Sequence, residues 1–116
     1  MCGTDSAVTE IVHLPAIRPA RLAERLAFDD LAAHVRHLRE PLRGARVEHL
    51  ADGVRLVLAL DVAAIARVAN LVRGEADALP FWTFRILADP PTCWLEVTGT
   101  GRAGGLARAV FEELAR

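Results

Sequence analysis

Two stretches of alternating apolar residues, each interrupted by a tight turn, constrain the fold of this chain more than any other feature. In residues 46–60 the turn is Asp52-Gly53, a dipeptide typical of two-residue β-hairpins. In residues 81–98 the two apolar runs are separated by Asp89-Pro90-Pro91. A helical pattern of apolar residues follows each hairpin. The sequence therefore predicts the element order strand–strand–helix twice.

Each predicted hairpin has one apolar face, and each predicted helix has one apolar stripe. In the first hairpin the expected inward set is Val47, His49, Val54, Leu56, Leu58 and Leu60. In the second, Trp82, Phe84 and Ile86 alternate with Phe81, Thr83 and Arg85. The expected helix stripes are Val62, Ile65, Ala69 and Val72, and Ala103, Leu106, Ala107, Val110, Phe111 and Leu114.

Burying these surfaces against each other predicts an α+β fold. We expect an N-terminal helix followed by two ββα repeats, with a four-stranded antiparallel sheet and helices on one face, as in a permuted ferredoxin-like sandwich. The repeat is indicated by Leu50-Ala51-Asp52, which aligns with Leu87-Ala88-Asp89.

The length of 116 residues predicts a single α+β domain over residues 1–116. Residues 1–18 are expected to be a lead-in segment, in which Ile11, Val12 and Leu14 can add a short strand. Residues 45–74 and 81–115 form the first and second ββα units. The intervening helical pattern starts near Pro19 and ends at Pro41 and Gly44, as one kinked helix or two short ones.

Charge and composition exclude several partners. The net charge is −1, which gives no electrostatic reason to expect binding to nucleic acid or to an anionic membrane. No apolar run approaches the roughly 18 residues of a membrane span. The two cysteines, Cys2 and Cys93, do not suggest a disulfide framework, and a reducing cytoplasm is the simpler location. Cys93 is expected to be a small buried hydrophobic residue.

A glycine triad, Gly99-x-Gly101-x-x-Gly104, is shared with dinucleotide-binding folds. Such a site needs a following parallel strand, whereas here one helix follows a hairpin strand. We therefore interpret the glycines as a strand-to-helix turn. An anion site at that helix N-terminus, assisted by Arg102, is the alternative. The prediction is a protein with no cofactor: no flavin, nicotinamide, haem or iron–sulfur centre.

The sequence favours structural roles over catalytic or metal-binding roles for three of the histidines. His34 and His37 are three residues apart on a helical pattern without a third metal ligand, which favours a solvated helix face. His49 is expected to be a core histidine bonded to backbone. No Ser-His-Asp arrangement or nucleophile elbow is present.

The segment from Leu71 to Phe84 holds the most informative ionisable groups. Glu75 and Asp77 lie between a helix expected to end at Gly74 and an aromatic-rich strand. A carboxylate placed among apolar side chains is suited to act as a general acid or base near neutral pH.

The chain resembles a group of small uncharacterised bacterial proteins at this segment. Their helix ends in Glu-x-x-Cys-Cys-Pro-Phe and is followed by an aromatic strand, a strand ending in Leu-Thr-Gly and a final helix. Glu75, Pro80-Phe81, Phe84 and Val97-Thr98-Gly99 occupy the corresponding places, over residues 45–114. Ala78 and Leu79 replace the paired cysteines, and His13 stands where relatives often have a cysteine. The resemblance favours Glu75 over Asp77 and carries over no thiol or soft-metal chemistry.

The resulting hypothesis is a small-molecule pocket protein, in its most specific form a cofactor-independent enzyme. It would perform proton-transfer chemistry (cyclisation, isomerisation or elimination) on a mostly apolar substrate. Glu75 and His13 are the predicted catalytic pair, and the ligand-binding residues are expected to be Trp82, Phe81, Phe84 and Asp77.

Two other classes of function stay open. The first is a non-catalytic module that forms a homodimer or binds a protein through the outer sheet face, where we expect Arg46, Val57, Ala59, Arg85 and Trp94. The second is a metal site built from His13, Glu75 and one more histidine.

Overall fold

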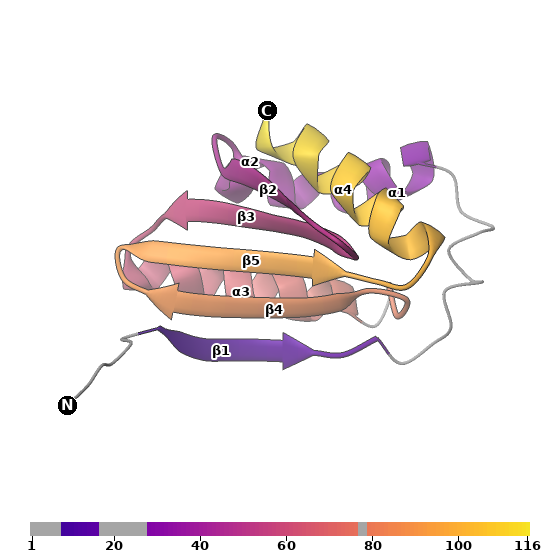
Figure 1. Cartoon of the computed structure of the whole chain (residues 1–116). Helices are drawn as coiled ribbons and strands as arrows, with labels where there is room; N and C mark the ends of the chain where they lie inside the picture. Colours follow the sequence, from indigo (N-terminus) through magenta and orange to yellow (C-terminus); the bar gives the residue numbers. More distant parts are fainter. Residues whose placement is uncertain (1–7, 17–27, 77–78) are drawn as a thin grey trace.

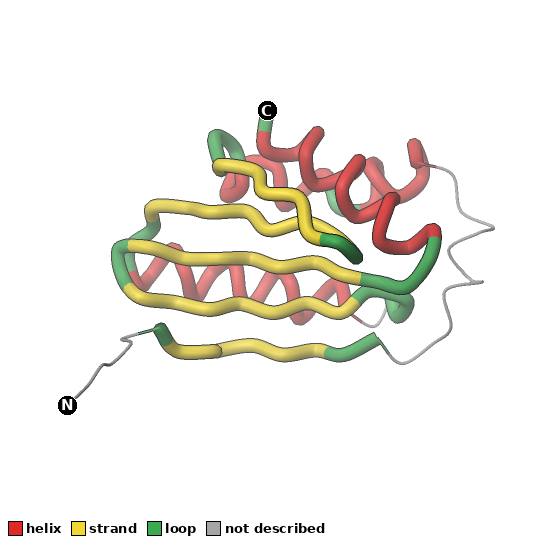
Figure 2. Tube along the Cα trace, viewed as in Figure 1, coloured by secondary structure: helices red, strands yellow, loops and turns green. Residues whose placement is uncertain are grey.

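The computed structural model describes residues 8–16, 28–76 and 79–116, which form a mixed α+β fold (Figures 1 and 2). Within these ranges, five strands make one antiparallel sheet, accompanied by four α-helices and a short 3-10 helix. The predicted α+β class is therefore confirmed, whereas the prediction of four strands is wrong. No helix in the described ranges is long and apolar enough to span a membrane.

Both predicted hairpins are present. β2 (Arg46–Leu50) pairs with β3 (Gly53–Ala59), and β4 (Thr83–Asp89) pairs with β5 (Thr92–Thr98). β3 and β5 lie side by side and join the hairpins, which gives the order β1-β4-β5-β3-β2. Every pairing among these strands is antiparallel, so the described part of the chain contains no parallel βαβ unit, as predicted.

The strand missing from the prediction is β1 (Thr9–Leu14), which lies along the outer edge of β4 (Figure 1). It comes from the segment expected to be a lead-in. Val12 is its only buried residue, and the register shifts between Glu10 and Val12. Because of this shift, apolar and polar residues do not alternate regularly along β1. The sequence therefore indicated only that a short strand could form here.

The two predicted helices that follow the hairpins are α3 (Val62–Ala76) and α4 (Arg102–Ala115). Asp61 caps α3, because its Oδ1 accepts a hydrogen bond of 2.7 Å from the Ala64 N–H. The whole predicted stripe of α4 is buried. The stripe of α3 is buried from Ile65 onward, but Val62 is 70% exposed, so its inclusion was wrong.

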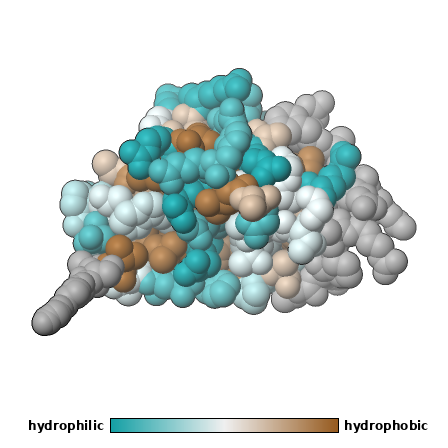
Figure 3. Space-filling view, viewed as in Figure 1, coloured by the Kyte–Doolittle hydropathy of each residue, from teal (hydrophilic) through white to brown (hydrophobic). Residues whose placement is uncertain are grey.

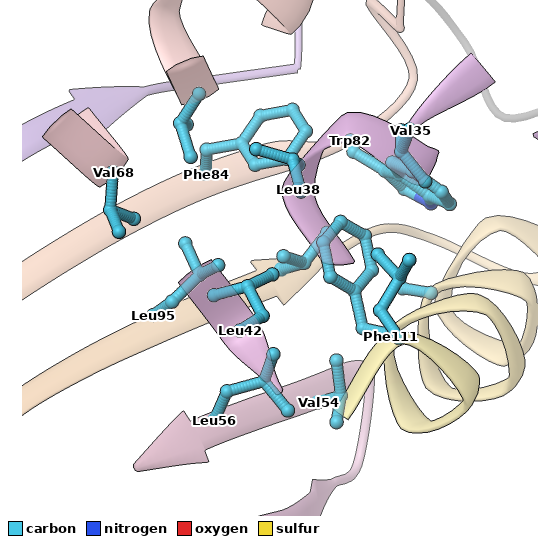
Figure 4. Close-up of a cluster of buried hydrophobic side chains, with 14 of the residues drawn as sticks. Val35, Leu38, Leu42, Val54, Leu56, Val68, Trp82, Phe84, Leu95 and Phe111 are labelled. Carbon is cyan, nitrogen blue, oxygen red and sulfur yellow. The ribbon is translucent and has the colours of Figure 1, made fainter. Parts of the chain in front are cut away.

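The N-terminal helical region is broken into short pieces: α1 (Phe28–His34), the 3-10 helix η2 (Arg36–Leu38) and α2 (Arg39–Leu42). Pro19, where the helix was predicted to begin, lies outside the described residues. Pro41 lies within α2, and Gly44 follows it with a φ of +80°. One stripe of this region is buried against the rest of the core, namely Leu31, Val35, Leu38 and Leu42. Figure 4 shows the last three of these side chains.

Trp82 occupies a central place in the core. Its ring makes edge contacts with Phe81, Phe84 and Phe111, at centroid distances of 5.1, 6.1 and 5.5 Å. Its Nε1–H donates a hydrogen bond of 2.8 Å to the carbonyl oxygen of Ala103 in the first turn of α4. The indole thus has both an apolar environment and a polar partner, and it fixes α4 against the start of β4 (Figure 4).

The glycine triad brings backbone segments close together. A Cβ at Gly104 would lie 2.6 Å from the carbonyl oxygen of Asp52, and one at Gly99 would lie 2.7 Å from the Cβ of Ala103. Gly101 has a φ of +55° and is the residue before α4. The Gly99 N–H also donates to the Asp52 oxygen at 2.9 Å. These glycines therefore join β5 and α4 to the β2–β3 turn, which supports the interpretation as a strand-to-helix turn.

Candidate functional site

Glu75 lies in the last turn of α3, which continues through Gly74 to Ala76. The prediction that the helix ends at Gly74 and that Glu75 lies in a loop was wrong. A Cβ at Gly74 would contact nothing within 4 Å, so this glycine meets no steric demand that would end the helix. The Glu75 side chain is only 11% exposed. A helical position holds this recessed carboxylate more firmly than a loop would.

Two histidines flank the Glu75 carboxylate. The Nε2 atom of His34, at the end of α1, lies 3.0 Å from Oε2. The Nε2 atom of His37, in η2, lies 3.2 Å from Oε1. Their three-residue separation puts both rings on one side of the α1–η2 segment. The rings are 46% and 43% exposed, so they lie between the carboxylate and the solvent.

The hydrogen bonding of this cluster is incomplete. Glu75 Oε2 is buried and has no hydrogen bond of good geometry among the described residues, although His34 is close. A buried acceptor without a donor is costly, so such an atom marks a place for a ligand N–H or O–H group. The arrangement therefore combines a carboxylate, two imidazoles and an unused acceptor position.

His13, the predicted partner of Glu75, lies elsewhere. It is on β1 opposite Arg85, and its Nδ1 lies 3.4 Å from Glu10 Oε1. Arg85 also pairs with Glu10 and Glu96, on the face of the sheet away from the core. The predicted Glu75–His13 pair is therefore not formed, because β1 carries His13 to the opposite side of the sheet from α3.

The predicted pocket wall belongs to the closed core. Phe81, Trp82 and Phe84 are each at most 1% exposed. Phe81 was expected to alternate outward, but β4 begins only at Thr83, so residues 81 and 82 precede the strand and both side chains turn inward. Asp77, the other predicted ligand-binding residue, lies outside the described residues.

His49 and Cys93 were both expected to be buried, and only one of them is. His49 is exposed on β2, and its Nε2 lies 2.8 Å from Glu112 Oε2, so its assignment to the core was wrong. An edge strand leaves this inward-facing position accessible to solvent. Cys93 is buried as predicted, and burial raises the pKa of its thiol to about 11.

The residues 8–16, 28–76 and 79–116 contain no group of three or more His, Cys, Asp or Glu side chains placed to hold a metal ion. The predicted set of His13, Glu75 and another histidine is divided by the sheet.

A groove of about 520 Å³ lies between α2 and α3. It is lined by Glu40, Pro41, Arg43, Leu60, Ala64, Arg67, Val68 and Leu71. Leu71, which lines the groove, precedes Glu75 by four residues on α3. Residues four apart on a helix lie on one face, one turn of about 5.4 Å from each other. The groove therefore leads along α3 toward the Glu75 cluster.

No described helix or strand covers the sheet face away from the helices, and this face combines charged and apolar residues (Figure 3). One charged residue from each strand, with alternating sign, forms a row across the sheet: Glu48, Arg55, Glu96, Arg85 and Glu10. Neighbours in this row are joined by ion pairs of 2.7 to 3.3 Å. Trp94 and Leu87 lie beside the row and line a hollow of about 240 Å³.

Comparison with family models, with curated proteins and with solved structures finds no match.

Sequence reasoning identified Glu75 but missed its partners. His34 and His37 were assigned to a solvated helix face, and both rings are indeed part exposed. Their three-residue spacing, which places two side chains on one side of a helix, was the available signal, but it could not show that the end of α3 packs beside them. That contact depends on the tertiary packing of α1 and η2 beside the end of α3.

Proposed function

We propose that this protein is a cofactor-independent enzyme that moves protons on a small, mostly apolar molecule, with Glu75, His34 and His37 as its acid–base groups. The observation that carries the proposal is the recessed Glu75 carboxylate, each of whose oxygens lies 3.0 to 3.2 Å from a histidine Nε2. His34 and His37 replace His13 as the proposed partners of Glu75.

The chemistry follows from the donor and acceptor sites of the three groups. A carboxylate next to the Nε2 atom of an imidazole favours the tautomer that carries its proton on Nε2. The ring's other nitrogen, Nδ1, is then the acceptor that takes a proton from a substrate. Because a histidine lies beside each carboxylate oxygen, one histidine can accept a proton while the other donates one. Isomerisation and elimination need this pair of roles.

Ring opening of nitrobenzisoxazole tests the proposal, since it needs only a base near an apolar binding surface. A base removes the proton on the ring carbon, the N–O bond breaks, and a nitrile and a coloured phenolate form. We expect Glu75→Gln to lower the rate by about 10²-fold or more, the usual contribution of general acid–base catalysis. The double variant His34→Ala, His37→Ala should lose a comparable factor.

Glu112→Gln is the matched control. It removes another glutamate that lies beside a histidine, at 2.8 Å from His49, but at an exposed position away from the groove. This variant should open the ring as fast as the unaltered protein. A Glu75→Gln variant with full activity, or an unaltered protein no faster than equal concentrations of free imidazole and acetate, would exclude the acid–base assignment.

A second candidate function is a dimerisation or protein-interaction module that uses the uncovered sheet face. The observation in its favour is the hollow beside Trp94, which is lined by Val8, Arg55, Leu87 and Glu96. Apolar side chains grouped on an otherwise charged sheet face are typical of an interface. Sedimentation analysis tests the homodimer form of this candidate, which a monomer at micromolar concentration would exclude. Either result leaves the acid–base assignment to the ring-opening assay, because that site uses residues of one chain only.

We also propose that the units β2-β3-α3 and β4-β5-α4 are two repeats in a permuted ferredoxin-like arrangement. The support is their shared element order and the strand order β4-β5-β3-β2, in which the last strand of each unit occupies the centre.

A further inference from the structure

We infer that the groove between α2 and α3 binds an elongated apolar molecule with an anionic group at one end, such as a medium-chain carboxylate. Its anion would lie at Arg67, and its other end would reach Glu75 and His37. The inference rests on the proposed function and names the substrate class for the same site.

The charges of the groove favour an anion. Arg43 and Arg67 both line it, and Glu40 is the one acidic residue among its described lining residues. The Arg43 guanidinium is 4.0 Å from the Glu40 carboxylate, and the Glu40 side chain is 86% exposed. Arg67 has no ion pair with any residue in the described part of the chain. One guanidinium in the groove is therefore not neutralised, and a carboxylate is its natural partner.

The remaining surface of the groove favours a hydrocarbon body. The aliphatic residues among its lining are Pro41, Leu60, Ala64, Val68 and Leu71. They come from both walls, so an apolar chain between them would lose contact with water on two sides. None of these side chains offers a hydrogen bond, so polarity in the middle of the ligand would be penalised.

The length of the ligand follows from the helix. Arg67 and Glu75 are eight residues apart on α3, which is about 12 Å along the helix axis. A compact polar metabolite cannot touch both groups, whereas an extended chain of medium length can. The groove thus separates the group that is recognised from the group that reacts.

Calorimetric titration with butanoate, hexanoate, octanoate and decanoate tests this inference. Affinity should rise by up to about fourfold per added methylene while the chain extends along the groove, and level off once it reaches the Glu75 cluster. Octanol, which has the same chain without the charge, should bind at least about tenfold more weakly than octanoate.

Two arginine variants separate the role of the groove from that of general surface charge. Arg67→Gln should lower octanoate affinity about tenfold or more and leave octanol affinity unchanged. Arg73→Gln, on the same helix but bonded to Asn70 and outside the groove lining, should bind octanoate like the unaltered protein. Equal octanoate affinity of the Arg67 variant, equal binding of octanol and octanoate, or no binding of either at millimolar concentration would overturn the inference.

The two proposals fail in different ways. Glu75→Gln keeps the size of the side chain, so it should retain octanoate binding while it loses ring opening. If ring opening is lost in this variant but octanoate binding does not depend on Arg67, the acid–base function stands and the substrate class is wrong. If ring opening persists in it, the acid–base function is wrong.

Discussion

Replacing Gly104 by alanine should destabilise the protein, although alanine favours helices. The new Cβ would lie 2.6 Å from the backbone oxygen of Asp52, whereas ordinary contacts begin at 3.4 Å, so α4 and the β2–β3 turn must separate by roughly 0.8 Å. Overpacking of this kind costs about 1–3 kcal/mol. The same movement weakens the Gly99-to-Asp52 hydrogen bond, which contributes about 1 kcal/mol.

The helix propensity of alanine offsets about 1 kcal/mol of that cost. The net loss in the free energy of unfolding is about 2 kcal/mol, or roughly 8 °C in Tm for a domain of this size. Differential scanning calorimetry measures both quantities.

Gly105→Ala is the control next to it in α4. A Cβ at Gly105 would meet nothing within 4 Å, so only the propensity gain acts. This variant should gain up to about 1 kcal/mol, or roughly 4 °C. If Gly104→Ala is as stable as Gly105→Ala, close packing is not the reason for the glycine triad.

Two further predictions follow from shifted ionisation. The hydrogen bond from Arg85 lowers the pKa of Glu10 in the folded protein. The pair therefore stabilises the fold at pH values above the pKa of the unfolded carboxyl group. This stabilisation is lost as the pH falls through the lower pKa of the folded state. The stability difference between the unaltered protein and Arg85→Gln should therefore shrink on acidification, as urea unfolding at several pH values will show; a difference that grows would contradict the pairing. Burial raises the pKa of the Cys93 thiol to about 11. In a Cys2→Ser background at pH 8, Cys93 should therefore react with a chromogenic disulfide reagent about 10²-fold more slowly in the folded than in the urea-unfolded protein. Equal rates would show that the thiol is not buried.

Local sequence patterns predicted most of the fold. Asp52-Gly53 and Asp89-Pro90-Pro91 marked the hairpins, and strict alternation marked their inward faces, because turn chemistry and burial act over a few residues. The fifth strand was only hinted at because a register shift breaks its alternation, leaving Val12 as its one buried residue. Such a strand is held mainly by its pairing to β4, which the local pattern does not encode.

The candidate site was predicted only in its central residue. Glu75 stood out as an acidic group among apolar ones, but its environment depends on which elements cross near the end of α3. His34 and His37 approach it from more than 35 residues away in the sequence. His13 was wrongly predicted to be its partner, because His13 lies on the other side of the sheet. The sequence does not show which face of an edge strand a residue occupies.

The alternating charged row on the uncovered sheet face restricts how a second copy could stack on it. The row runs Glu48, Arg55, Glu96, Arg85, Glu10, one residue per strand. A two-fold axis parallel to the strands and passing over any one of them would place each charge against its own kind. An axis midway between β5 and either of its neighbours, about 2.4 Å from β5, would place both arginines against glutamates. Two stacked copies are therefore electrostatically complementary only when the two-fold axis passes between strands. The charged row would thus determine how far one sheet is shifted across the strands of the other.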